Sequence, residues 1–249
     1  MTPLHANPQL PLAFLLGGAQ SGKTRFAASV ALECEKLFET REQASSVCFV
    51  GTARLDGDAG SELRSRIGGL RLERPPRWST LEPSSETPDV LAVLENVLAL
   101  SAEQRPRCVV FDCATLWLAW ELSRDFSKYS AAQLSQHLEA QGVYLVRVAT
   151  SLAEAGIVTI VVSSETGAGI VPGTVSGRLF RDALGLLNMR AAAASSLVLH
   201  MVAGLSLCLR EGGPSLNDDA PVRRVGASTV AHSLLRPSAS SSFSSSTPF

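Results

Sequence analysis

The feature that most constrains this chain is a glycine-rich loop near its start, at residues 17–24. The loop reads GGAQSGKT and satisfies the pattern G-x-x-x-x-G-K-[ST] in full. An apolar run precedes it, and the segment RFAASVALECEKLF, which favours a helix, follows it. Strand, loop and helix in this order are the context in which the pattern indicates a phosphate-binding loop (P-loop). The other interpretation is a plain glycine-rich turn.

The residue types in this loop suit a triphosphate. Glycines let the backbone fold around phosphate with its N–H groups turned inward, and the start of the following helix adds partial positive charge. Lys23 is expected to reach the β- and γ-phosphates, and the Thr24 hydroxyl is expected to bind Mg²⁺. The sequence therefore predicts binding of ATP or GTP with Mg²⁺ as cofactor, and it leaves the choice of base open.

Composition excludes several other classes of function. The 22 Lys and Arg residues are balanced by 23 Asp and Glu residues, so no overall positive field exists to bind nucleic acid. No run of about 18 apolar residues occurs, so no membrane span is expected. The five cysteines are odd in number and form no C-x-x-C pair. This pattern argues against a disulfide framework or a zinc site and favours a reducing compartment, the cytoplasm.

Short apolar runs alternate with longer amphipathic ones along the body of the chain. Strands are expected at residues 11–16, 47–52, 107–113 and 157–164. Helices are expected at residues 23–38, 59–67, 89–100, 131–155 and 176–194. Residues 197–202 and 205–209 read as two tightly joined strands. The alternation predicts an α/β fold, a mostly parallel sheet with helices on both faces.

The same pattern predicts one domain at residues 10–210. Residues 1–9 are polar, contain two prolines and are expected to form a loose N-terminal lead-in. Residues 211–249 are expected to form a disordered tail that becomes serine-rich towards its end. A serine-rich segment cannot bury enough apolar surface to offset the entropy lost on ordering.

Two carboxylates follow buried apolar runs. Asp112 ends the run CVVFD and is the candidate for a second Mg²⁺ ligand, although an Asp here could instead cap the next helix. Glu165 follows the run at residues 157–164 and could act as a base or contact a substrate, because ligands bind at the carboxyl ends of parallel strands. A solvated loop carboxylate is the alternative for Glu165.

Several segments together resemble one enzyme family. They are LLGGAQSGKTRFA, CFVGTARLDGD, RIGGLRLERPPRWSTLE, VVFDCATLWLAW and VVSSETGAGIVPGTVSGRLFRDALGLLNMRAAAASSLVLHMVAG. Their order and spacing are similar to those of the bifunctional adenosylcobinamide kinase/adenosylcobinamide-phosphate guanylyltransferases of cobalamin biosynthesis. The element E-x-G-x-G-I-V-P followed by F-R-D is more specific than the P-loop, and a plain P-loop kinase would not carry it.

The resemblance implies a RecA-like P-loop fold, a homotrimer and two reactions. The first phosphorylates the aminopropanol hydroxyl of adenosylcobinamide, and the second transfers GMP from GTP onto that phosphate. Lys23, Asp112 and Glu165 are then the expected catalytic residues, with Thr24 and Asp112 on the metal. The expected nucleotide-binding residues are Gly17, Gly18, Ala19, Gln20, Ser21, Gly22, Lys23, Thr24, Gly51, Thr52, Ala53, Arg71, Leu72, Glu73, Arg74, Glu82 and Asp112.

The chain departs from the family at the position that matters for the second reaction. The resemblance implies a histidine that becomes guanylylated, in a segment R-I-x-x-H, and this chain has Leu70 there. A leucine has no nucleophilic atom, so no phosphoramidate can form on it. Three hypotheses follow: a kinase that has lost guanylyl transfer, an enzyme that keeps both activities by another route, and a degenerate nucleotide-binding subunit that regulates or scaffolds a partner.

Overall fold

The computed structural model describes residues 10–38, 46–54, 61–84, 89–124, 129–212 and 223–235. The described residues form one mixed sheet in the order β3-β2-β4-β5-β1-β6-β7-β8. Its strands are β1 (Leu12–Gly17), β2 (Val47–Gly51), β3 (Ser79–Leu81), β4 (Cys108–Asp112), β5 (Val158–Val162), β6 (Leu197–Val202), β7 (Leu205–Glu211) and β8 (Arg223–Arg224). The helices are α1 (Lys23–Leu37), α2 (Ser61–Leu72), α3 (Val90–Val97), α4 (Ala114–Ser123), α5 (Ala131–Glu154), α6 (Val175–Ala194) and α7 (Ala227–Leu234).

The strands from β3 to β6 run parallel, and β7 and β8 are antiparallel additions at one edge. The predicted α/β fold with a mostly parallel sheet is therefore confirmed. Parallel pairing places the carboxyl ends of β1, β2, β4 and β5 along one edge of the sheet. The chain segments that leave these ends form the wall of the site described below.

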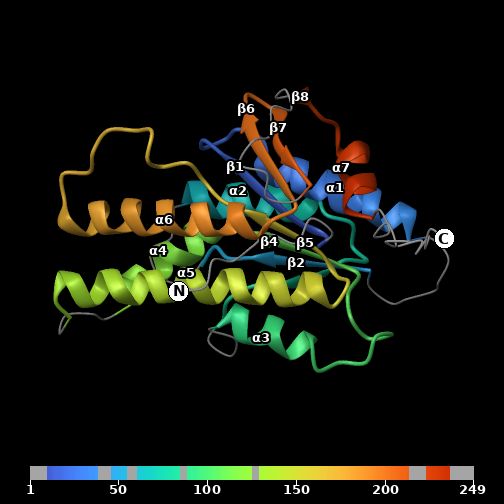
Figure 1. The fold of residues 1–249 in the computed structure, drawn as a ribbon, viewed down its shortest axis with the longest axis horizontal. Helices are drawn as coiled ribbons and strands as arrows, with labels where there is room; N and C mark the ends of the chain where they lie inside the picture. The colour runs from blue at the N-terminus through green and yellow to red at the C-terminus, as the bar shows by residue number, and fades with distance from the viewer. Residues whose placement is uncertain are drawn as a thin grey trace, which may run out of the picture.

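Side chains of β1 alternate between two hydrophobic layers, because successive residues of a strand point to opposite faces. Leu12 and Phe14 pack in the layer that contains residues of α3, α4, α5 and α6. Ala13 and Leu15 pack in the layer that contains residues of α1 and α7. Figure 1 shows α5 and α6 side by side across one face of the sheet, with α1 and α7 together on the other side.

Polar residues fix where the helices on the first face begin. The Ser130 side chain accepts a hydrogen bond from the backbone N–H of Gln133, and the Gln133 side chain accepts one from the backbone N–H of Ser130. Helix α5 therefore starts in a capping box. Asp89 and Thr174 cap α3 and α6 in the same way through their side-chain oxygens. None of the helices in the described segments combines the length and the apolar character needed to cross a membrane.

The expected element boundaries need three corrections. Helix α2 ends at Leu72, although Gly68 and Gly69 favoured an end at Ile67, so the helix is longer than its glycines suggested. The short strand β3 was missed because three residues are too few to show a period. Helix α4 follows Asp112 almost at once, and its near-uniform apolar character hides the helical period.

The predicted disordered tail at residues 211–249 is wrong for part of its length. Residues 223–235 form β8 and α7, and Val225, Val230, Ala231 and Leu234 are buried against the layer that contains α1. Four buried apolar side chains supply the contacts that the serine-rich composition of the chain end did not suggest. The lead-in at residues 1–9 and the serine-rich segment at 236–249 lie outside the described residues.

Candidate functional site

The glycine-rich loop joins the carboxyl end of β1 to the start of α1. A Cβ on Gly17 would lie 2.4 Å from the backbone oxygen of Met201, so only glycine fits against β6 at this point. Gly22, directly before α1, has a φ of 94°, a backbone conformation that is strained in any residue with a side chain. Gln20 also has a positive φ, 55°. The loop therefore has the tight curvature that the sequence pattern predicted.

Lys23 lies inside the loop. Its Nζ donates hydrogen bonds to the backbone oxygens of Gly17 at 2.9 Å and Gly18 at 2.6 Å, and only 8% of the residue is exposed. Two carbonyl oxygens thus satisfy donors of the buried Lys23 ammonium group. The base of the loop is thus a fixed cationic point.

A turn that sequence reasoning did not associate with the site supports the loop from behind. The backbone N–H of Gly204, in the turn between β6 and β7, donates to the oxygen of Ser21 at 3.0 Å. Ala203 and Gly204 both have positive φ, as the tight turn requires. The pair Ala203-Gly204 was visible as a turn in the sequence, but nothing in the sequence placed it beside residues 17–24.

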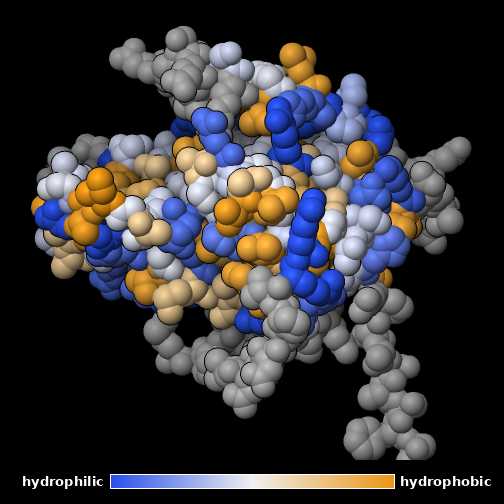
Figure 2. All heavy atoms as spheres, turned by 90° about the horizontal axis from the view of Figure 1, so that it is seen from above, coloured by the Kyte–Doolittle hydropathy of each residue, from blue (hydrophilic) through white to orange (hydrophobic). Residues whose placement is uncertain are grey.

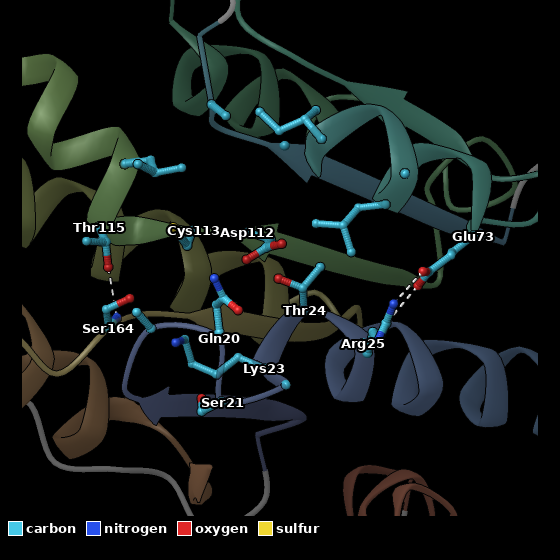
Figure 3. A pocket seen from close by; sticks show the side chains of 18 of the residues that line it. Gln20, Ser21, Lys23, Thr24, Arg25, Glu73, Asp112, Cys113, Thr115 and Ser164 are labelled. Carbon is cyan, nitrogen blue, oxygen red and sulfur yellow. Dashed lines mark hydrogen bonds and ion pairs between the residues drawn. The ribbon is translucent and has the colours of Figure 1, made fainter. Parts of the chain in front are cut away.

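A cavity of about 580 Å³ opens in front of the loop. Figure 3 shows Asp112, at the end of β4, and the Thr24 hydroxyl turned towards the same part of this cavity. The lining residues are Ala19, Gln20, Ser21, Gly22, Lys23, Thr24, Arg25, Gly51, Ala53, Ser65, Ile67, Gly69, Leu70, Glu73, Arg74, Glu82, Asp112, Cys113, Thr115, Leu116 and Ser164.

Asp112 and Thr24 fit a magnesium ion by their chemistry. A carboxylate and a hydroxyl are hard oxygen donors, and Mg²⁺ in nucleotide sites takes one or two protein oxygens with phosphate oxygens and water. Among the described residues, no group of three or more His, Cys, Asp or Glu side chains is placed to hold a metal ion. Any Mg²⁺ here would therefore depend on the phosphates for most of its ligands.

Thr52 fixes the chain immediately after Asp112. Its Oγ1 donates to the oxygen of Cys113 at 2.7 Å and accepts from the N–H of Cys113 at 2.8 Å. Its own N–H donates to the oxygen of Asp112 at 2.9 Å. Thr52 is 1% exposed and does not line the cavity. We infer that it positions Asp112 rather than contacting a nucleotide.

A second buried network fixes the other side of β4. Thr115 Oγ1 accepts from the N–H of Ser164 at 2.8 Å, and Ser163 donates to Asn188 Oδ1 at 2.7 Å. Asn188 Nδ2 returns a bond to the oxygen of Ser164 at 3.1 Å. These contacts tie α4 and α6 to the end of β5, so the wall of the cavity is held from three elements.

The opposite wall carries Arg74. Its guanidinium carbon lies 3.7 Å from the centroid of the Phe49 ring, and its Nη1 lies 3.7 Å from Glu82 Oε1. Burial lowers the pKa of Arg74, while the charges of Glu82 and Asp112 oppose the shift. The Arg74 side chain is only 9% exposed, and its Nε and Nη1 are buried without a hydrogen-bond partner. These N–H groups are donors available to an anionic ligand.

The structure brings most of the expected nucleotide-binding residues together. Twelve of them line the cavity: Ala19, Gln20, Ser21, Gly22, Lys23, Thr24, Gly51, Ala53, Glu73, Arg74, Glu82 and Asp112. The others do not line it. Gly17 and Gly18 form the base of the loop, Thr52 is buried behind Asp112, Arg71 pairs with Glu82, and Leu72 is 89% exposed.

Glu165 does not line the cavity either. Its Oε1 accepts a hydrogen bond from the N–H of Gly167 at 2.9 Å, and its N–H donates to the oxygen of Gly17 at 3.1 Å. Strand β5 ends at Val162, earlier than expected, so Glu165 belongs to the turn beyond the strand. The geometry gives this carboxylate a local role in that turn.

Leu70 faces the cavity from α2, together with Ile67 and Gly69. None of the described residues that line the cavity is a histidine. Cys113 does line it, but burial raises the pKa of its thiol to about 11, with a smaller contribution from Asp112. A thiol with that pKa is protonated at neutral pH and is a poor nucleophile.

Comparison with known proteins decides the family. Residues 13–209 match the model of a family described as "Cobinamide kinase / cobinamide phosphate guanyltransferase". The chain belongs to this family. The match covers the P-loop, both buried networks and the hairpin of β6 and β7, and it stops before β8 and α7.

Three curated proteins are similar over nearly their whole lengths. The bifunctional adenosylcobalamin biosynthesis protein CobP of Pseudomonas aeruginosa is 32% identical over 197 residues, which cover 79% of this chain and 95% of that protein. The CobU proteins of Escherichia coli and Salmonella typhimurium are 26% and 25% identical, and each comparison covers 80% of this chain and 99% of the relative.

The position of Thr52 generates a first prediction. Thr52→Val removes both bonds to Cys113 and should raise the Mg²⁺ concentration needed for half-maximal ATP or GTP binding by about tenfold, because residues that orient a metal ligand affect its affinity by that order. Isothermal titration calorimetry measures the change. Thr52→Ser should restore binding.

Thr159→Val is the matched control for this prediction. Thr159 is also 1% exposed on a strand, but its hydroxyl bonds to Ile157 at the other end of the sheet. It should lose similar stability, about 1–3 kcal/mol, without a change in Mg²⁺ dependence. Equal effects of the two substitutions on Mg²⁺ dependence would refute the positioning role of Thr52.

Proposed function

We propose that this protein phosphorylates the aminopropanol hydroxyl of adenosylcobinamide with ATP or GTP, as a P-loop kinase of cobalamin biosynthesis. The observation that carries the proposal is the set formed by Lys23, Thr24 and Asp112 around one cavity, in a chain of the cobinamide kinase family. The reaction forms an O–P bond to the acceptor oxygen and breaks the bond to the nucleoside diphosphate. The hydroxyl proton leaves to solvent or to a nearby base.

The main task of the protein in this reaction is to stabilise the negative charge on the transferring phosphoryl group, because the protein itself does little covalent chemistry in the transition state. Lys23 and the N–H groups of the loop lie where the β- and γ-phosphates bind in P-loop proteins. Arg74 supplies further donors from the opposite wall. Both side chains are held by the folded chain: Lys23 by the oxygens of Gly17 and Gly18, and Arg74 by Phe49 and Glu82.

Thr24 and Asp112 are the residues that would hold Mg²⁺. When bound, the ion neutralises charge between the β- and γ-phosphates. Asp112 is held in place through the bonds that Thr52 makes to the oxygen of Asp112 and to the backbone of Cys113. We assign no step to Glu165, whose carboxylate is engaged in its own turn.

The test is phosphate transfer to adenosylcobinamide, followed by mass spectrometry of the corrinoid. The wild-type protein should add one phosphate from ATP or GTP. Lys23→Ala should lower the rate at least about 100-fold, because it removes a fixed donor to the transition state.

Lys36→Ala on the same helix is the control, because Lys36 is exposed and pairs with Glu33. This control should retain full activity. A wild-type protein that gives no phosphorylated corrinoid would exclude the proposed reaction. Tight nucleotide binding without any turnover would instead favour the regulatory or scaffold subunit, for which the structure offers no separate observation.

We propose further that guanylyl transfer in this chain does not pass through a GMP adduct at position 70. Leu70 lines the cavity where the resemblance implies a nucleophilic histidine. His137, His200 and His232 do not line the cavity, and burial raises the pKa of the Cys113 thiol that does. A second reaction, if present, would be direct attack of the corrinoid phosphate on the α-phosphorus of GTP, with pyrophosphate leaving.

Leu70→His tests this point. Wild-type protein incubated with GTP should carry no covalent GMP in intact-protein mass spectra, and Leu70→His should gain one GMP because an imidazole then faces the nucleotide. A wild-type protein that is labelled with GMP would contradict the proposal, and peptide mapping would locate the true nucleophile.

We also propose a homotrimer in the cytoplasm, as the resemblance implies. The loop before α6 supports association because Ile170, Val171 and Val175 are 97%, 61% and 56% exposed. Hydrophobic side chains gather at that end of the molecule on the face shown in Figure 2. All five cysteines are free, which suits a reducing compartment. Sedimentation velocity should give three times the chain mass of 26.3 kDa, and a monomer would refute the trimer.

A further inference from the structure

The cavity has two unlike ends. In Figure 3, Cys113, Thr115 and Ser164 lie towards one end, Asp112 and Thr24 lie near the middle, and the exposed ion pair of Arg25 and Glu73 lies at the other end. The Lys23 side chain extends towards the first end, where its Nζ meets Gly17 and Gly18. Because the P-loop lysine contacts the β- and γ-phosphates, the terminal phosphate belongs at this first end. An acceptor that attacks it in line must approach from there.

Helix α4 borders this end of the cavity. Thr115 and Leu116, in its first turn, both line the cavity, and Leu116 is 40% exposed. Trp120 follows Leu116 by four residues and so lies on the same face of the helix. Trp117 and Leu118 point into the core instead. An apolar strip made of Leu116 and Trp120 therefore leads from the phosphate end of the cavity outwards along α4.

Two guanidinium groups lie over the Trp120 ring in the outer half of this strip. The guanidinium carbon of Arg54 lies 3.9 Å from the centroid of the Trp120 ring, and that of Arg124 lies 5.2 Å from it. Arg54 comes from the segment after β2, next to Ala53, which lines the cavity. Guanidinium groups offer several N–H donors in a plane and suit amide oxygens beside an apolar surface.

We propose that the strip of Leu116 and Trp120 is the docking site for the corrin ring of the acceptor. This inference depends on the proposed kinase function and names where its second substrate binds. A cobinamide presents a broad macrocycle with methyl groups and amide side chains, so it needs an apolar surface edged by hydrogen-bond donors. The strip offers both, and it is continuous with the end of the cavity where the hydroxyl must arrive.

Other exposed apolar side chains fit this role less well. Ile170, Val171 and Val175 are more exposed than Leu116, but none of them lines the cavity. Leu70 and Ile67 line it from α2, on the wall that also carries Arg74 and Glu82. Leu116 is the exposed large apolar side chain, among the described residues, that belongs to both the cavity and the surface.

The experiment measures KM for each substrate separately, together with equilibrium binding of cobinamide by calorimetry. Leu116→Ala and Trp120→Ala should each raise KM and Kd for cobinamide roughly tenfold, the ratio that corresponds to about 1.4 kcal/mol of lost contact. KM for ATP or GTP should stay within about twofold. Leu116→Met should restore the affinity, because methionine keeps the apolar contact.

Leu100→Ala is the matched control. Leu100 is also 40% exposed, but it lies outside the cavity, so its substitution should change neither KM. Thermal unfolding of Trp120→Ala shows whether that variant is folded, and Leu116→Ala decides the question if it is not. Sedimentation velocity is recorded for every variant.

Three outcomes overturn the docking site: unchanged cobinamide affinity in Leu116→Ala, an equal loss of nucleotide affinity, or a loss of subunit association that accompanies the KM change. The last would show that a second copy of the chain covers the strip. A wild-type protein that binds cobinamide without phosphorylating it, and loses that binding in Leu116→Ala, would retain the docking site while excluding the kinase. Absence of any cobinamide binding by wild type would exclude both.

Discussion

The site depends on the close packing of the glycine-rich loop against strand β6 and on the buried Lys23 side chain inside that loop. Gly17 lies against the backbone of β6, where a Cβ would be 2.4 Å from the oxygen of Met201, and Lys23 is held inside the loop by two carbonyls. The turn at Gly204 closes the loop from behind. With these contacts the cationic point stays fixed at the carboxyl end of the sheet, and every other part of the cavity is arranged around it.

Buried hydroxyl and amide groups fix the positions of the residues at the ends of β4 and β5. Thr52 holds the backbone of Asp112 and Cys113, and Thr115 joins α4 to the end of β5. Buried polar groups of this kind stabilise a fold only when each has its partner, so they favour one arrangement of the elements over near alternatives. The geometry of the site thus depends on Thr52, which does not line the cavity, as well as on Thr115, which does.

Membership of the family and the chemistry of the cavity agree for phosphoryl transfer and diverge for the second reaction. The P-loop, Thr24 and Asp112 occupy one cavity, as a kinase requires. At position 70, where the resemblance implies a histidine, the same cavity is lined by Leu70. The two walls of the cavity therefore differ: the start of α1 and the end of β4 carry Lys23, Thr24 and Asp112, and α2 carries Leu70.

The sequence by itself determined the curved glycine-rich loop, the mostly parallel sheet and the position of Asp112 at a strand end, because each leaves a local signal: a spaced motif, an alternation of apolar runs, or an acid that ends a buried strand. Only the tertiary structure decided that Glu165 turns away, that Thr52 supports Asp112, that Leu116 lines the cavity and that α7 completes the core. Those facts are contacts between residues far apart in the chain. Such contacts have no period or spacing of their own, so they exist only once the sheet has brought its strand ends together.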